Sequence, residues 1–278
     1  MSIKVVNLNH IYDKGLPTEH VALSDVSFEA NDGEIIGIVG HTGSGKSTLL
    51  EHLNGLLKPT QGKIYVDDVD ITEPKVSMVQ IRRKVGLVFQ YPEYQLFEET
   101  VVKDICYGPK NLGLSEEECL ERAKEALKLV GLSYDEIGNR SPFDLSGGQK
   151  RRVAIAGILA MRPEVLILDE PTAGLDPKAH NDVIELVKEV HRRTGNTTII
   201  VSHNMQDIAQ LSDRVLVLHK GKVVAFDKPE VVFSNDDALE AIGLDMPPIS
   251  EFCQKLGIPG IVMDMDTAVE KIKERFYD

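Results

Sequence analysis

The stretch from Gly40 to Ser47 has the residue types and spacing of a phosphate-binding loop. It reads GHTGSGKS, which fits G-x4-G-K-[ST], and it lies between the apolar run Glu34–Val39 and a helical pattern from Lys46 to about Leu57. Glycines let backbone N–H groups wrap around phosphates, and the N-terminus of the following helix adds partial positive charge. In this pattern Lys46 reaches the β- and γ-phosphates and the Ser47 hydroxyl binds Mg²⁺. The motif alone predicts a nucleotide phosphate site, which kinases and GTPases also have. The predicted nucleotide contacts in this segment are Gly40, His41, Thr42, Gly43, Ser44, Gly45, Lys46, Ser47 and Thr48.

Two adjacent acids, Asp169 and Glu170, come directly after a second short apolar run, Val165–Leu168. In open α/β sheets the carboxyl ends of the strands face the ligand crevice, so both acids are expected there. Asp169 is suited to hold Mg²⁺ through water, and Glu170 to orient or deprotonate an attacking water. Together with the phosphate loop, the pair predicts nucleotide hydrolysis.

Composition limits the class of protein. The chain has 278 residues, of which 42% are hydrophobic, enough for one large domain or for one domain plus a small appendage. Its formal net charge of −13 repels phosphate backbones, so we expect no nucleic-acid partner. No apolar run approaches the roughly 20 residues of a membrane helix, and the N-terminus lacks the apolar stretch of a signal peptide. We therefore expect a soluble, cytoplasmic chain that another protein must hold if it works at a membrane.

Strand and helix patterns alternate around these motifs, as expected for an α/β protein. Ile3–Leu8 and Val21–Glu29 are strand patterns that precede the phosphate loop, and the region from about Tyr91 to Met161 is helical in pattern. Further expected strands are Glu34–Val39, Lys63–Val69, Lys84–Phe89, Val165–Leu168, Thr197–Ser202, Val215–Leu218 and Lys222–Phe226, and further expected helices are about Ser146–Met161 and Pro177–Arg193.

Two helix starts carry capping signals. Ser115 and Glu118 form a capping-box sequence ahead of apolar residues at helical spacing, and Thr267 with Glu270 has the same spacing in the tail. The tail after about Val231 is expected to hold this helix and one earlier short amphipathic helix.

Leu145–Gln149 reads LSGGQ and ends the helical region, just before the acid strand. With this pentapeptide the chain resembles the ABC ATPase family, whose signature it is, over residues 1 to about 230. The resemblance implies an α/β fold: a P-loop NTPase core with a RecA-like α/β subdomain and an antiparallel β subdomain, plus an inserted helical subdomain at about 91–161. Residues 231–278 are expected to form a small C-terminal helical extension. It also implies an ATPase with ATP and Mg²⁺ as cofactors.

The resemblance extends to single residues. It implies that Tyr12 stacks on adenine, that Gln90 contacts Mg²⁺ and water, and that His203 lies near the γ-phosphate. Asp176 ends the loop Ala173–Asp176, which in this family crosses between two subunits. The residues expected to be catalytic are Lys46, Gln90, Glu170 and His203, and those expected to bind metal are Ser47, Gln90 and Asp169.

The signature also implies a dimer. In the family, Ser146, Gly147 and Gly148 of one subunit close over ATP held by the other, and Gln149 completes the motif. Because Ser146 starts a helix, that helix can point N–H groups at the γ-phosphate. Hydrolysis then removes the bridging phosphate and opens the dimer. The intact motifs allow either a homodimer or a heterodimer with a paralogous ATPase.

The segment after Gln90 narrows the resemblance. It contains YPEYQLF at Tyr91–Phe97 and YGPKNLG at Tyr107–Gly113, and the tail contains GLDMPP at Gly243–Pro248. These runs resemble the ATPase subunits of energy-coupling factor (ECF) importers, including the cobalt and nickel branch. That resemblance implies a membrane coupling protein (T component) and a substrate-binding membrane protein (S component) as partners. It places the chain peripherally at the cytoplasmic face of the membrane and makes the tail a dimer contact. The cargo of such importers is a vitamin or a transition-metal ion.

Three acids in this segment, Glu93, Glu98 and Glu99, suggest that a basic residue of the membrane partner docks there. Our hypothesis is that Glu93 or a neighbour pairs with a partner arginine, and the alternative is a solvated acidic face. Two other functions compete with import: a soluble ABC ATPase for assembly or repair, and a regulatory nucleotide-binding module without turnover. The Tyr91–Gly113 segment favours import over the first, and the complete set of catalytic residues disfavours the second.

Overall fold

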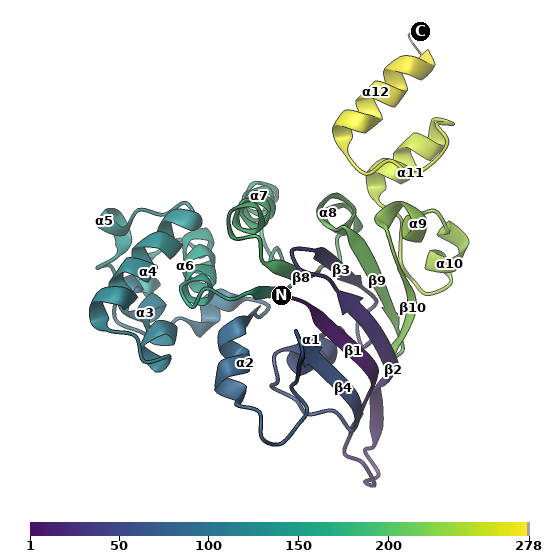
Figure 1. The fold of residues 1–278 in the computed structure, drawn as a ribbon. Coiled ribbons are helices and arrows are strands. Elements are labelled where there is room, and N and C mark those ends of the chain that lie inside the picture. The colour runs from purple at the N-terminus through teal and green to yellow at the C-terminus, as the bar shows by residue number, and fades with distance from the viewer. Residues whose placement is uncertain (277–278) are drawn as a thin grey trace. The chain divides into compact units, whose positions relative to one another are not determined.

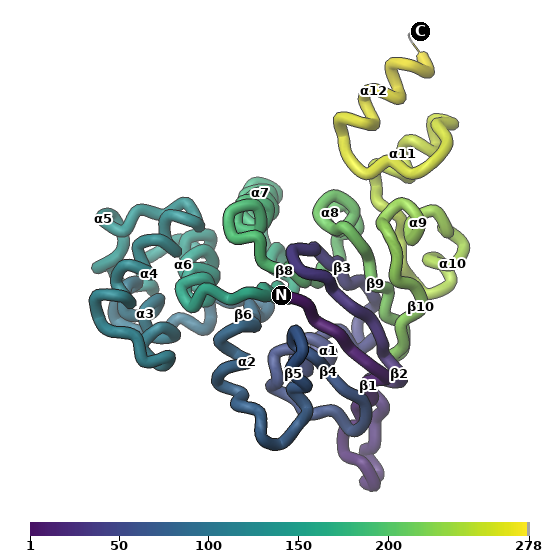
Figure 2. The backbone as a smooth tube through the Cα atoms, viewed as in Figure 1, coloured from purple at the N-terminus to yellow at the C-terminus, as the bar shows by residue number. Residues whose placement is uncertain are grey.

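A computed structural model describes residues 1–276, and the chain divides into two compact units. The phosphate-loop unit comprises Ser2–Pro74 and the residues from Ile199 on, and the helical unit comprises Met1 and Lys75–Thr198. Strand β8 (Thr197–Val201) begins in the helical unit and ends in the phosphate-loop unit. Figures 1 and 2 trace the chain through both units.

The phosphate-loop unit contains an antiparallel sheet and a group of strands around a fully buried one. The sheet has the order β2-β1-β4-β5, seen side by side in Figure 2. Separately, β3 pairs in parallel with β9, which pairs antiparallel with β10. All five residues of β3 are buried because the run is wholly apolar. The strands are β1 (Ile3–Tyr12), β2 (His20–Ala30), β3 (Ile35–Val39), β4 (Gln61–Val66), β5 (Val69–Asp70), β9 (Arg214–His219) and β10 (Lys222–Asp227).

Two strands of this unit differ from expectation. β1 continues to Tyr12 instead of ending at Leu8, because shifts of register near His10 let pairing with β2 resume after the apolar alternation breaks. The run expected as one strand, Lys63–Val69, is divided by a turn in which Asp67 has a φ of 51°.

In the helical unit, β6 and β7 are parallel neighbours. Helices α3, α4 and α6 pack on one another, and Figure 1 shows them as a cluster with α5. The elements are α2 (Met78–Lys84), β6 (Val85–Val88), the 3₁₀ segment η1 (Pro92–Gln95), α3 (Val101–Asn111), α4 (Glu116–Leu129), α5 (Tyr134–Ile137), the 3₁₀ segment η2 (Pro142–Asp144), α6 (Gly147–Leu159), β7 (Val165–Asp169) and α7 (Pro177–Thr194). Helix α2 has no counterpart among the expected elements.

The capping box expected at Ser115 is confirmed. The Ser115 N–H donates to Glu118 Oε2 at 2.8 Å, and the Glu118 N–H donates to Ser115 Oγ at 3.2 Å. Behind this cap, Cys119, Ala123 and Leu127 are buried on the inner face of α4, as their helical spacing predicts.

The tail folds into short helices with a small core of its own. Cys253, Ile258, Val262 and Ala268 form that core. The helices that complete the phosphate-loop unit are α1 (Lys46–Leu53), α8 (Met205–Leu211), α9 (Pro229–Phe233), α10 (Asp236–Glu240), α11 (Pro248–Lys255) and α12 (Met265–Phe276). Residues 277 and 278, the end of the expected 231–278 extension, lie outside the described residues. Within the described range, no helix is both long and apolar enough to cross a membrane.

The prediction that Thr267 caps the last helix is wrong. Helix α12 begins at Met265, before Thr267, and the Asp264 carboxylate accepts the Thr267 N–H at 2.8 Å. The carboxylate also accepts the Thr267 hydroxyl, so Asp264 caps this helix and Thr267 lies inside its first turn.

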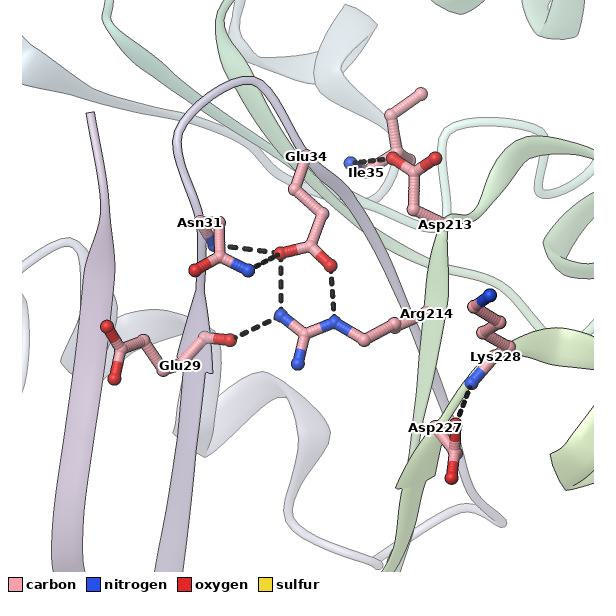
Figure 3. Close-up of polar contacts among 8 residues, drawn as sticks. All are labelled: Glu29, Asn31, Glu34, Ile35, Asp213, Arg214, Asp227 and Lys228. Carbon is pink, nitrogen blue, oxygen red and sulfur yellow. Dashed lines mark hydrogen bonds and ion pairs between the residues drawn. The ribbon is translucent and has the colours of Figure 1, made fainter.

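An ion pair ties β9 to the turn before β3, as Figure 3 shows. Arg214 holds both carboxylate oxygens of Glu34 and donates from Nη2 to the Glu29 carbonyl oxygen at 2.7 Å. Its guanidinium lies 4.3 Å from the centre of the Phe226 ring, and Asn31 adds two hydrogen bonds to Glu34. Burial alone would raise the pKa of Glu34, but the bonds and charge of Arg214 outweigh it and lower that pKa below 4.5.

This lowered pKa predicts an acid dependence of stability. A carboxyl group whose pKa is lower in the folded state stabilises the fold above its unfolded pKa and loses that contribution as pH falls. We expect Glu34→Gln to lower the free energy of unfolding at pH 7, and the difference from wild type to shrink below about pH 4.5. Urea unfolding at several pH values measures this. A difference that is the same at pH 3.5 and pH 7 would contradict it.

Candidate functional site

The phosphate loop joins the buried strand β3 to helix α1. Its conformation requires glycine at position 45, where φ is +105° and an added Cβ would lie 2.6 Å from the Ala22 carbonyl oxygen. The hydroxyl-bearing Ser47 is exposed in the first turn of α1, as a Mg²⁺ ligand must be. The sequence predicts this loop, and its strand–loop–helix context is confirmed.

Lys46 lies folded into the loop. Its Nζ donates to the carbonyl oxygens of Gly40 at 2.5 Å and His41 at 3.1 Å, and the residue is 7% exposed. These carbonyls hold the ammonium over the same loop whose N–H groups are expected to wrap the phosphates. A buried cation needs partners of opposite charge, so an anion in the loop would stabilise it further.

Tyr12 and His203 belong to the same unit as the loop. Tyr12 ends β1 with 38% of its surface exposed, and its hydroxyl lies 3.3 Å from Thr48 Oγ1 on α1. His203 is exposed directly after β8, which lies beside β3 in the strand order. Asn204 follows it and caps α8.

In the helical unit, the parallel strands β6 and β7 bring two predicted residues together. Gln90 Nε2 donates to Glu170 Oε2 at 3.2 Å, across 80 residues of sequence. Because a carboxylate only accepts hydrogen bonds, the Gln90 amide nitrogen must face Glu170. Gln90 Oε1 then points away from Glu170 and can serve as an oxygen ligand. Asp169, half-buried, ends β7 beside Glu170.

The backbone around this pair is unusual. Glu170 has a φ of +48° and Tyr91, next to Gln90, a φ of +55°. Such values are uncommon outside glycine and cluster at functional sites, where the surrounding structure holds them. Both outliers flank the hydrogen bond between Gln90 and Glu170.

The signature pentapeptide begins helix α6. Ser146 Oγ accepts the Gln149 N–H at 3.3 Å, and Gln149 Oε1 accepts the Ser146 N–H at 3.1 Å. A Cβ on Gly147 or Gly148 would meet no atom within 4 Å, so the helix N-terminus is open to a ligand. Through its hydrogen bond to the Ser146 N–H, the Gln149 side chain also caps the helix, a structural role that the sequence analysis did not assign. Its predicted nucleotide contact remains a prediction.

Asp176 likewise caps a helix. Its Oδ1 accepts the N–H groups of Lys178 at 3.0 Å and Ala179 at 3.1 Å, which starts α7. The loop before it comes close to the ring of Tyr91, since a Cβ on Gly174 would lie 3.3 Å from that ring. A subunit-crossing role for Asp176 is untested by these contacts.

Arg151 on α6 joins three segments of the helical unit. It is 1% exposed, and its Nε and Nη2 donate to the two Glu93 carboxylate oxygens at 2.9 and 2.8 Å. Its Nη1 donates to the carbonyl oxygens of Pro171 at 3.1 Å and Ala173 at 2.9 Å, just after Glu170. One guanidinium therefore connects the signature helix, the segment after Gln90 and the loop after Glu170.

This network corrects the expectation for Glu93. The arginine that pairs with Glu93 lies in the same chain, and the Glu93 side chain is 17% exposed. Glu99 is also engaged within the chain, by Lys103 at 2.6 Å. Sequence reasoning missed Arg151, although its position four and eight residues before Ile155 and Leu159 places it on the buried face of α6.

Comparison with known proteins identifies the family of the chain. The family model described as "ABC transporter" matches residues 23–173. "Energy-coupling factor transporter ATP-binding protein EcfA2" of Caldanaerobacter subterraneus subsp. tengcongensis is 56% identical over 275 residues, 99% of this chain and 96% of that protein. The protein of the same name from Clostridium tetani is 57% identical, over 92% of this chain and 89% of its own.

Solved structures agree. CbiO1 of Clostridium perfringens, described as part of the ABC transporter complex cbiONQ, is 37% identical with a TM-score of 0.76, over 91% of this chain and 98% of that chain. The ATP-binding cassette MJ0796, a dimer bound to ADP and Pi, is 32% identical with a TM-score of 0.71, over 82% of this chain and 98% of that chain.

The fold is that of an ABC-type ATPase. Its relatives are transporter subunits, and the chain belongs to the ATP-binding proteins of energy-coupling factor transporters within the ABC transporter family. The chain is therefore an ATPase coupled to transport. The expectation of an ABC ATPase is confirmed, and the alternative of a soluble assembly or repair ATPase is not supported.

Proposed function

We propose that this chain hydrolyses ATP with Mg²⁺ as the ATPase subunit of an importer at the cytoplasmic face of a membrane. The observation that carries the catalytic part is the Gln90–Glu170 hydrogen bond at the ends of two adjacent parallel strands. It brings together the two residues expected to handle the attacking water. The importer part is supported by relatives named as energy-coupling factor transporter proteins.

In this proposal the residues divide the work on one ATP. Lys46 neutralises the β- and γ-phosphates, and the N–H groups of Gly43–Ser47 hold them. Glu170 accepts the proton of the water that attacks the γ-phosphorus, the bond to the β–γ bridging oxygen breaks, and ADP and phosphate are released. His203 donates a hydrogen bond to the γ-phosphate, and Tyr12 stacks on adenine.

The residues present suit Mg²⁺. Ser47, Asp169 and Gln90 offer a hydroxyl, a carboxylate and an amide oxygen, the hard oxygen ligands that Mg²⁺ prefers. The exposure of Ser47 and the orientation of the Gln90 amide both fit this role. When bound, Mg²⁺ supplies positive charge against the β- and γ-phosphates.

We further propose that the working form is a dimer of ATPase subunits, either two copies or this chain with a paralogue. The open N-terminus of α6 at Ser146–Gly148 supports a role in covering ATP held by the other subunit. The solved MJ0796 cassette is itself a dimer, which supports the same arrangement.

The membrane partners are proposed from the relatives. A coupling protein (T component) and a substrate-binding protein (S component) would complete the importer, with a vitamin or a transition-metal ion such as cobalt or nickel as cargo. CbiO1 is described as part of the ABC transporter complex cbiONQ, which supports assembly into a larger transporter. No contact with the cargo is assigned to this chain.

For the tail, 231–278, we propose a dimer contact. Helices α11 and α12 form an apolar groove that includes Ile249, Phe252, Met265 and Val269. Phe252 and Met265 are 55% and 62% exposed, more than a monomer needs to expose in one place. Covering this groove would remove that apolar surface from water.

Co-purification of the tagged chain from native membranes, followed by mass spectrometry, tests the importer proposal. We expect a small integral coupling protein, a variable second membrane protein, and ATPase activity that Lys46→Ala abolishes. The second ATPase recovered decides between homodimer and heterodimer. Recovery of soluble partners alone would contradict the importer, while loss of activity in Lys46→Ala would still support the ATPase.

A further inference from the structure

Four residues, two on strand β1 and two on helix α1, form a closed ring of contacts. The His10 ring meets the Tyr12 ring edge-on, with centres 4.4 Å apart, and the His52 ring likewise, with centres 4.6 Å apart. His10 Nδ1 and His52 Nε2 are 3.1 Å apart, and His52 Nδ1 lies 2.7 Å from the Thr48 carbonyl oxygen. The Tyr12 hydroxyl lies 3.3 Å from Thr48 Oγ1, which closes the ring.

The hydrogen bonds fix one tautomer for each neutral histidine. A carbonyl oxygen only accepts, so His52 Nδ1 carries the hydrogen and its Nε2 is bare. That Nε2 must accept from His10 Nδ1–H, which leaves His10 Nε2 as a bare nitrogen. Within the described part of the chain, this buried His10 Nε2 has no hydrogen-bond partner. Burial lowers the pKa of His52, which favours the neutral form of that ring.

A histidine pair is a costly way to fill this space. His52 is fully buried and His10 is 8% exposed, and the elements that carry them also bury apolar residues such as Leu8 and Leu49. Two leucines would fill similar volume without desolvating four ring nitrogens. What the histidine pair provides instead is a fixed orientation of both imidazole rings, because each hydrogen bond permits one orientation of each ring.

The oriented His10 ring contacts Tyr12, the residue proposed to stack on the base. Thr48 lies two residues after Lys46 on α1, so the ring links Tyr12 to the helix that carries the phosphate-binding lysine. The Tyr12 ring meets His10 edge-on, its hydroxyl lies beside Thr48, and 38% of the residue's surface is exposed. We propose that His10 and His52 are positioning residues that hold Tyr12 against the nucleotide base and so set the preference of the site for ATP over a bare triphosphate. This inference rests on the proposed stacking role of Tyr12.

Dissociation constants for ATP and for inorganic tripolyphosphate, measured on the full chain with Mg²⁺, test the proposal. We expect His52→Leu to weaken ATP binding about five- to tenfold, a fraction of what stacking on an aromatic ring provides, and to leave tripolyphosphate binding unchanged. Tyr12→Ala should weaken ATP at least as much, and adding His52→Leu to it should cause no further loss. His191→Leu is the matched control, since His191 also hydrogen-bonds a threonine, Thr198, from a helix, α7.

The outcomes test the positioning role of the two histidines separately from the stacking role of Tyr12. If Tyr12→Ala leaves ATP binding unchanged, the stacking role of Tyr12 is wrong and the inference falls with it. If Tyr12→Ala weakens ATP but His52→Leu does not, or weakens tripolyphosphate equally, the positioning role alone is overturned. Should His52→Leu fail to fold, His10→Phe keeps the ring against Tyr12 but removes the donor to His52. A smaller, ATP-specific loss is then expected, and its absence overturns the proposal.

Discussion

Replacing Glu170 by glutamine is expected to lower ATP turnover at least about a hundredfold while ATP still binds. General-base catalysis contributes roughly 10²–10⁴ to rate, and an amide cannot accept the proton of the attacking water. Glutamine keeps the size of the side chain and can still meet the Gln90 amide, which now contacts Glu170 at 3.2 Å. Single-turnover hydrolysis at saturating ATP and Mg²⁺ measures the loss, and a binding titration checks that affinity is retained.

Glu164 provides the control for this variant. It precedes the same strand, β7, at the opposite end, and its carboxylate pairs with Lys84 at 3.8 Å on the surface. Glu164→Gln should hydrolyse ATP at the wild-type rate. Because Glu170→Gln would retain the γ-phosphate, it should also remain dimeric in ATP by size-exclusion chromatography. Turnover of Glu170→Gln within a few-fold of wild type would rule out Glu170 as the base.

The parts of the site that the sequence predicts are those built from local pattern. A wholly apolar run of only five residues, followed by a glycine-rich loop, is typical of a buried strand, so Ile35–Val39 predicts where the phosphate loop begins. The same holds for Val165–Leu168 and the acids that follow it. The helix start at Ser115 is predictable because the cap and its partner Glu118 lie three residues apart, but the same spacing at Thr267 misleads because Asp264 caps that helix instead.

The features that the sequence does not predict depend on distant residues or on weak local signals. Helix α2 has seven residues, of which the last three are Arg82, Arg83 and Lys84, and it buries only Ile81. Its apolar face is therefore too short to give a helical pattern in the sequence. The contact between Arg151 and Glu93 spans 58 residues, and either charge alone resembles an ordinary surface residue. The left-handed backbone of Glu170 also has no local signature, because glycine or asparagine would be the expected residue there.

Removal of the Arg151 guanidinium is expected to destabilise the protein by about 3–5 kcal/mol, the cost of breaking a buried ion pair from one side. Arg151→Met keeps the length of the side chain but leaves the half-buried Glu93 carboxylate without its cation. It also leaves the carbonyl oxygens of Pro171 and Ala173 without their donor. Urea unfolding of the full chain measures the change in free energy of unfolding.

Arg152 is the matched control, because it is the next residue on α6 and also pairs with an acid. Its partner Asp182 lies at 3.1 Å, but the two side chains are 27% and 47% exposed. A solvent-exposed pair of this kind contributes about 1 kcal/mol or less, so Arg152→Met should have a small effect. Both variants lose one positive charge, so the difference between their losses of stability measures the effect of burial.

A second substitution distinguishes the unpaired charge from the lost carbonyl contacts. Glu93→Gln added to Arg151→Met removes the buried negative charge, so part of the lost stability should return. The Pro171 and Ala173 carbonyls still lack their donor in the double variant, so turnover should remain below wild type even where folding is restored, because the loop after Glu170 has lost its anchor. If Arg151→Met costs no more than Arg152→Met, the three segments do not depend on Arg151. The alignment of Glu170 must then come from β7 and the Gln90 contact alone.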